Sequence, residues 1–157
     1  MRRILVGAIV FIVVAGAAVQ VVPYGRAHTN PPTRVEPAWN SEATRALAVR
    51  ACFDCHSNQT VWPWYSDIAP ISWLIQRDVD EGRRKLNFSE WDRPQKEAHE
   101  SGKTVRRGEM PPWFYAIPGS GARLSSAEQD ALTAGLDATL GSSRKPGRKS
   151  GHKERDD

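Results

Sequence analysis

Five consecutive residues, Cys52-Phe53-Asp54-Cys55-His56, constrain this chain more than any other stretch of its 157 residues. The pattern C-x-x-C-H places two thiols on one side of a helical turn, with an imidazole directly beside them. It is the attachment signature of c-type haem, in which both thiols add to the porphyrin vinyl groups and the histidine becomes an axial iron ligand. We therefore predict one haem c, covalently bound through Cys52 and Cys55, with His56 as an iron ligand.

Three other uses of two cysteines at this spacing stay open. A redox dithiol of the thioredoxin type is expected to open a helix in a β-α-β setting, and no such pattern surrounds the motif. A structural zinc site needs further ligands, usually a second pair that the sequence lacks. A disulfide between Cys52 and Cys55 would close a very small loop, with little entropic gain.

Met110 is the candidate for the second iron ligand, and it is the only methionine besides Met1. It lies in the segment Gly108-Glu109-Met110-Pro111-Pro112-Trp113, where two prolines fix the backbone directly after it. A thioether is a soft, neutral ligand, and a His/Met pair raises the potential of cytochromes c. We predict that Met110 binds the iron opposite His56. His99 is an alternative ligand, and a loop methionine packed against aromatic rings is the structural alternative.

The N-terminal segment predicts a membrane helix. Residues Ile4 to Val22 carry no charge, and Gln20 is their only polar side chain. At about 1.5 Å per residue this helix is ~28 Å long, close to the ~30 Å hydrocarbon core of a bilayer. Arginines before the run are expected to stay in the cytoplasm, so the chain is expected to cross the cytoplasmic membrane once and carry its C-terminal domain in the periplasm. A cleaved signal peptide, which would leave a soluble periplasmic protein, is the alternative.

We divide the chain into four parts: a membrane anchor or signal (1–22), an extended proline-rich linker (23–40), a haem-binding domain (41–140) and a disordered charged tail (141–157). Residues 27–140 carry 13 basic and 15 acidic side chains, so the basic excess of the whole chain lies near its two ends. Nucleic-acid binding is not expected, because the basic side chains do not gather on a folded face.

Four soluble helices are expected. The first starts at Asn40 or Ser41 and runs into the haem motif, and the second has Pro70 in its first turn. A polar third helix is expected from Asp92 to about Val105, and the last begins with a capping box at Ser125. Two apolar stripes are assigned to the core: Ile71, Leu74, Ile75 and Val79 on the second helix, and Leu132, Leu136 and Leu140 on the last. The last helix is expected to pack against the first. The predicted class is all-α: a small cytochrome c-like helical domain wrapped around one covalent haem, after a transmembrane helix.

Segments beyond the haem motif carry a family resemblance: Pro23 to Arg26, His28 to Pro32, Trp62 to Tyr65, Ile68 to Trp73, Asn87 to Trp91 and Gly108 to Trp113. Through them, from about Pro23 to Leu140, the chain resembles a bacterial haem-binding domain family of membrane-anchored monohaem proteins with cytochrome c-like character. The resemblance implies haem binding and a helical fold, and it supports Met110 opposite His56. It implies no particular redox partner.

Six tryptophans are many for a chain of this length, and we predict that Trp64, Trp73 and Trp113 line the haem pocket and keep it dry. Ordinary core packing is the alternative, and His28 is interpreted as a linker residue. We expect an electron carrier and not an enzyme, because an iron with both axial positions filled leaves little room for a substrate. A haem-based sensor or accessory module with a labile Met110 is the second hypothesis, and a weak peroxidase-like enzyme the third.

Overall fold

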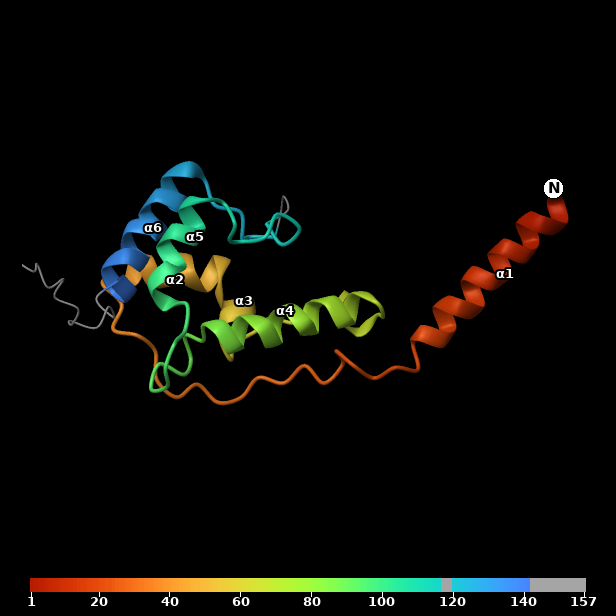
Figure 1. Cartoon of the computed structure of the whole chain (residues 1–157), viewed down its shortest axis with the longest axis horizontal. Coiled ribbons are helices and arrows are strands. Elements are labelled where there is room, and N and C mark those ends of the chain that lie inside the picture. Colours follow the sequence, from red (N-terminus) through yellow and green to blue (C-terminus); the bar gives the residue numbers. More distant parts are fainter. Residues whose placement is uncertain (117–119, 142–157) are drawn as a thin grey trace, which may run out of the picture.

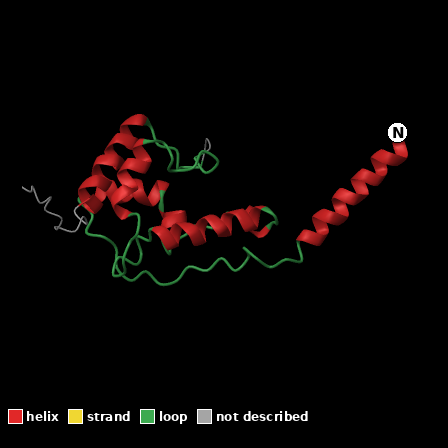
Figure 2. Ribbon diagram, in the orientation of Figure 1, coloured by secondary structure: helices red, strands yellow, loops and turns green. Residues whose placement is uncertain are grey.

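The computed structural model describes residues 1–116 and 120–141 (Figure 1). Within these residues every regular element is helical, which confirms the all-helical class, and no strand is formed (Figure 2). The elements are α1 (Arg2–Val19), α2 (Glu42–Ala51), α3 (Phe53–His56), η1 (Trp64–Asp67), α4 (Ile71–Lys85), η2 (Ala98–Glu100), α5 (Ser101–Arg106) and α6 (Ser126–Leu140), where η marks a 3-10 helix. Nearly all of the predicted disordered tail lies outside the described residues.

The core lies where α6 packs against α2 and α5, as expected for the last helix. Its apolar stripe is buried, with Leu132, Leu136 and Leu140 each at most 2% exposed. The predicted capping box is present, since the Ser125 hydroxyl accepts from the backbone N–H of Glu128 and the Glu128 carboxylate accepts from that of Ser125. Gly135 lets the two backbones approach, because a Cβ there would lie 2.2 Å from Oγ1 of Thr44.

The first soluble helix starts as predicted but stops short of the motif. Ser41 caps α2, its hydroxyl accepting from the N–H of Thr44 at 3.1 Å. Cys52 leaves the helical conformation, with φ −127° and ψ −33°, and α3 then forms a separate turn. The reason is packing: the break lets Phe53 turn into the core, where it is 2% exposed and its ring centroid lies 5.5 Å from that of Phe88.

The third helix was expected from Asp92, but helical structure begins only at Ala98. Side chains in the intervening segment bond to the preceding connection and hold the backbone away from helix. Arg93 donates to the carbonyl of Arg83 at 2.6 Å, and Oε1 of Gln95 accepts from the N–H of Asn87 at 2.9 Å. These contacts outweigh the local capping pattern, and only the last part of the predicted helix forms.

The assignment of the α4 stripe to the core was wrong for two of its four residues. Val79 is buried, but Ile71 is 44% and Leu74 is 57% exposed. The buried side of α4 consists mainly of small and polar residues: Ser72, Gln76, Val79 and Gly82. Segments from elsewhere in the chain cover that side; for example, the Ser72 hydroxyl donates to the carbonyl of Tyr24 at 3.5 Å. The described chain therefore leaves about half of the Ile71 and Leu74 side chains exposed.

The proline-rich segment is extended, but it lies along the domain and is not a free linker (Figure 1). His28, interpreted as a linker residue, stacks on Trp62 with ring centroids 4.6 Å apart and contacts Ser66 through its Nε2. Further along, Arg83 donates to the carbonyl of Thr29 at 2.9 Å. The segment thus forms one wall of the folded unit.

Helix α1 is long and apolar enough to cross a membrane, and no residue of it is buried. A signal sequence near the N-terminus would meet the same criteria.

Candidate functional site

The two cysteines and the histidine lie on one helical turn, as the motif requires. The N–H of Cys55 and that of His56 both donate to the carbonyl of Cys52, at 3.2 and 2.9 Å. Phe53 anchors this turn in the core, while the three motif side chains stay half-buried beside it. Both thiols are free in the structure and project from a fixed backbone.

The imidazole of His56 is held by the C-terminal part of α4. Its Nδ1 lies 3.1 Å from the carbonyl oxygen of Leu86 and 3.2 Å from that of Gly82. Both partners are acceptors, so Nδ1 carries the proton and Nε2 keeps its lone pair. Burial lowers the pKa of His56, which favours the neutral ring that a metal ligand needs. Nε2 is therefore suited to bind iron, with the ring orientation fixed by backbone carbonyls.

Gly82 makes this arrangement possible. A Cβ at Gly82 would lie 2.4 Å from the carbonyl oxygen of Cys55, closer than any side chain can approach backbone. The missing side chain therefore lets α3 lie directly on α4. Sequence reasoning missed this role of Gly82, for which the signal was a glycine inside an otherwise regular helical pattern.

Burial raises the pKa of both thiols to about 12, with further contributions to Cys55 from Asp78 and Asp54. Redox-active dithiols have a lowered pKa, so these thiols are not poised for disulfide exchange. A structural zinc site also lacks support, because no group of three or more His, Cys, Asp or Glu side chains within 1–116 and 120–141 is arranged to hold a metal ion.

The loop that carries Met110 is tied to the motif through Tyr115. Its phenol donates a hydrogen bond to Oδ2 of Asp54, one of the two residues between the cysteines. Burial and this bond raise the pKa of Tyr115 above its usual range, so the phenol stays a donor. Oδ1 of Asp54 accepts from the N–H of Val61 at 2.9 Å, so one carboxylate joins three segments. Sequence reasoning missed Asp54 and Tyr115.

Met110 itself is 38% exposed, beyond α5 and after Gly108, whose φ is +69°. The alternative ligand His99 lies in η2, where its Nε2 is 3.8 Å from a Glu100 carboxylate oxygen. The hydrogen bond from Tyr115 thus brings the Met110 loop to the motif. Ligation by Met110 remains a prediction.

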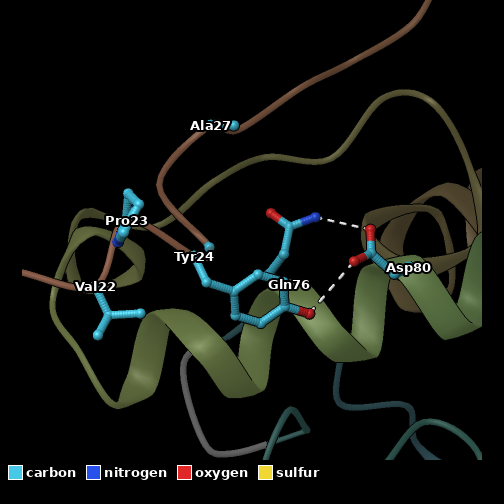
Figure 3. A pocket seen from close by; sticks show the side chains of 7 residues that line it. Val22, Pro23, Tyr24, Ala27, Gln76 and Asp80 are labelled. Atoms are coloured by element: carbon cyan, nitrogen blue, oxygen red, sulfur yellow. Dashed lines mark hydrogen bonds between the residues drawn. The ribbon is translucent and has the colours of Figure 1, made fainter. Parts of the chain in front are cut away.

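The three tryptophans predicted to line a pocket lie in different settings. Trp64 and Trp113 are 77% and 83% exposed, on η1 and on the Met110 loop. Trp73 is half-buried on α4, and its Nε1 has no partner among the described protein groups. A hollow of about 420 Å³ lies elsewhere, between the segment after α1 and the side of α4 that carries Gln76 and Asp80 (Figure 3). Its lining does not include the motif residues.

A helical domain that presents a neutral histidine beside two thiols on one turn has the donor set of a haem-binding protein. A family model described as the haem-binding domain matches residues 14–138 of the chain. The chain belongs to this haem-binding domain family, which confirms the resemblance described above. No curated protein and no solved structure matches it.

Proposed function

We propose that the chain is a c-type cytochrome-like protein that transfers single electrons at the outer face of the cytoplasmic membrane. Cys52 and Cys55 would bind the porphyrin as thioethers, and His56 and Met110 would bind the iron. The observation that carries the proposal is the geometry of His56: two carbonyls hold Nδ1–H and leave Nε2 free on the same turn as both thiols.

A face of α4 that leads from buried Gly82, where Cys55 packs, to the partly exposed residue Ile71 supports this proposal. Ile71, Ile75, Asp78 and Gly82 follow one another at intervals of four, three and four residues, which puts them on one face of the helix. Cys55 packs on that face at Gly82, and Asp78 lies near enough to raise the pKa of its thiol. A flat apolar group attached at Cys55 would therefore find Ile71 and Ile75 beside it. Covering these side chains is favourable at about 25 cal/mol per Å² of apolar area.

When bound, haem supplies a one-electron iron couple. Cys52, Cys55, His56 and Met110 would hold that group in place. Hydrogen bonds from Nδ1–H of His56 make the ring a stronger ligand and prevent it from turning. The Tyr115 to Asp54 bond holds the Met110 loop near the motif, and the prolines after Met110 limit its backbone. Fixed ligands on both sides would let the iron change charge with little rearrangement.

Covalent attachment tests the cofactor directly. Wild-type protein expressed with a haem-attachment system should keep its haem after denaturation and acidic organic extraction. The double variant Cys52→Ser, Cys55→Ser should release all of it. A colourless wild-type protein with two titratable thiols, or haem that is fully extracted from wild type, would overturn the proposal.

The proposed location depends on α1 as an uncleaved anchor with its arginine end in the cytoplasm. The mature chain should then remain in the membrane fraction after a high-salt wash, and its intact mass should include residues 1–22. A soluble mature protein that begins near Ala18 would instead identify a cleaved signal peptide.

A haem-based sensor is the second candidate function, and the exposure of Met110 favours it. If Met110 is labile, carbon monoxide should bind rapidly to the reduced protein, and Met110→Ala should leave the signalling function intact. In a carrier, Met110→Ala should abolish the reversible redox couple. Peroxidase activity is expected to be low, because Arg106 pairs with Asp137 on α6 and Arg107 with Glu109.

A further inference from the structure

We propose that η1 and the residue after it, Trp64 to Ile68, lie in the lipid headgroup layer, so that the bilayer is a second contact surface of the haem domain. This inference rests on the proposed anchoring of α1 in the membrane. A second contact would fix the orientation of the haem domain relative to the membrane, which α1 alone would not do.

Gln20, directly after α1, fixes the distance between that helix and the turn before α4. Its Nε2 donates to the carbonyl of Ala69 at 2.8 Å, and its Oε1 accepts from the N–H of Ala69 at 3.1 Å. Arg26 donates to the same Oε1 at 2.8 Å. One side-chain amide therefore pairs with both backbone groups of Ala69, which immediately follows the proposed lipid-facing segment.

The length of α1 sets the depth of this contact. Its 18 residues span about 27 Å at 1.5 Å per residue, against a hydrocarbon core of ~30 Å. Gln20 then lies at the outer edge of the hydrocarbon, and Ala69 lies within hydrogen-bonding reach of it. Figure 1 shows the same arrangement, with the N-terminal end of α4 toward α1 and the bundle of α2, α5 and α6 at the far side.

The side chains at this depth suit a bilayer interface. Trp64, Tyr65 and Ile68 are 77%, 40% and 42% exposed, so the described chain leaves much of their apolar surface open. The Trp64 and Tyr65 rings meet edge to face at 5.7 Å, which makes one aromatic patch. Trp and Tyr are the residues enriched where headgroups meet acyl chains, and the neighbouring Asp67 would reach the polar layer. A lipid surface matches both the composition and the position of the patch.

Photo-crosslinking of the full haem-loaded chain in phosphatidylcholine nanodiscs tests this inference. The nanodiscs contain a phospholipid with a diazirine near its headgroup, and adducts are located by mass spectrometry after proteolysis. We expect adducts on α1 and on Trp64 to Ile68, the latter about tenfold above those on α6, which lies at the far side of the domain from α1 (Figure 1). The variant Tyr65→Ser, Ile68→Ser removes two exposed side chains that are not assigned to the haem pocket. It should lower the second set of adducts several-fold but keep the first set and the haem spectrum.

Each outcome has a distinct meaning. Two outcomes would overturn the inference but leave the membrane anchoring of α1 unaffected. One is adducts on α1 alone, and the other is strong labelling of Trp64 to Ile68 by a water-soluble carbene reagent in the same nanodiscs. Adducts on neither segment would overturn the anchor as well. Loss of the haem spectrum in the double variant would assign these side chains to the haem pocket and contradict the membrane contact.

Discussion

At the scale of single residues, the candidate site depends on groups that the haem motif does not contain. The carbonyls of Gly82 and Leu86 orient His56, and Tyr115, on the loop of the proposed second ligand, donates to Asp54 of the motif. Gly82, Leu86 and Tyr115 lie between 26 and 61 positions from their partners in the motif. Only a folded chain brings them together, which is why they were not predicted.

Gly82→Ala should damage the site through backbone contact. The added Cβ would lie 2.4 Å from the Cys55 carbonyl oxygen, so α3 must move away from α4. We expect a loss of about 1–3 kcal/mol in the free energy of unfolding, typical of overpacking, and a lower yield of attached haem. Urea denaturation measures the first and the absorbance ratio of haem to protein the second.

Gly141→Ala is the matched control, because no heavy atom lies within 4 Å of a Cβ at that position. If Gly82→Ala were as stable as this control and carried as much haem, the close packing of α3 on α4 would have no role.

Tyr115→Phe should weaken the proposed bond between Met110 and the iron, although Tyr115 is not itself a proposed ligand. The phenol donates to the Asp54 carboxylate, and a hydrogen bond to a charged group contributes about 1.5–3 kcal/mol. We therefore expect the fraction of protein without the methionine-to-iron bond to rise by about tenfold or more. Carbon monoxide binding to the reduced protein reports this fraction. Tyr65→Phe is the control, and equal binding by the two variants would show that Tyr115 does not position the loop.

At the scale of elements, α4 divides into a covered polar side and an uncovered apolar side. Ile71→Asn places a polar group on the face that carries Cys55, where we propose that the porphyrin lies. Ile71 is 44% exposed, so the haem-free protein should lose no more than about 0.5 kcal/mol of stability. Haem attachment should fall more than in Arg77→Asn, which changes an exposed position elsewhere on α4. Equal haem content in both variants would contradict the assignment of this face.

The N-terminus of α6 should make stability depend on pH. Hydrogen bonds from Ser125 and Arg50 lower the pKa of Glu128 from 4.5 to about 2. Because the unfolded chain binds this proton more readily, the contribution of Glu128 is complete above pH 4.5 and disappears as the pH falls toward 2. Wild type should thus melt above Glu128→Gln at pH 7, and the gap should close at pH 2.

Asp130→Asn, on the same helix, is the control for charge removal. Two results would contradict the role of the cap. The difference in melting temperature between wild type and Glu128→Gln could be the same at pH 2 as at pH 7, or at pH 7 it could equal the difference caused by Asp130→Asn.

At the scale of the whole molecule, the sequence predicted helix caps and the buried stripe of α6 correctly. It did not predict which side of α4 other segments of the chain bury. The Ser125 capping box, the Ser41 cap and the buried leucines of α6 depend on neighbours within a few residues, and the structure confirms them. Which side of α4 is buried depends on contacts such as that between Ser72 and Tyr24, 48 residues apart. The same holds for the contact between His28 and Trp62.

The chain as a whole combines an apolar N-terminal helix with a haem-binding domain, and Gln20 joins the two. In our proposal His56 of the haem motif binds one side of the iron. Met110, on a loop held by Tyr115, would bind the other side, and this His/Met pair would make the protein an electron carrier.

The absorption spectrum of oxidised wild-type protein in the far red is the decisive measurement for this ligand, because a methionine-to-iron bond gives a weak band there. We expect this band in wild type, its loss in Met110→Ala and its retention in His99→Ala. A five-coordinate, high-spin spectrum without the band in wild type would contradict ligation by Met110.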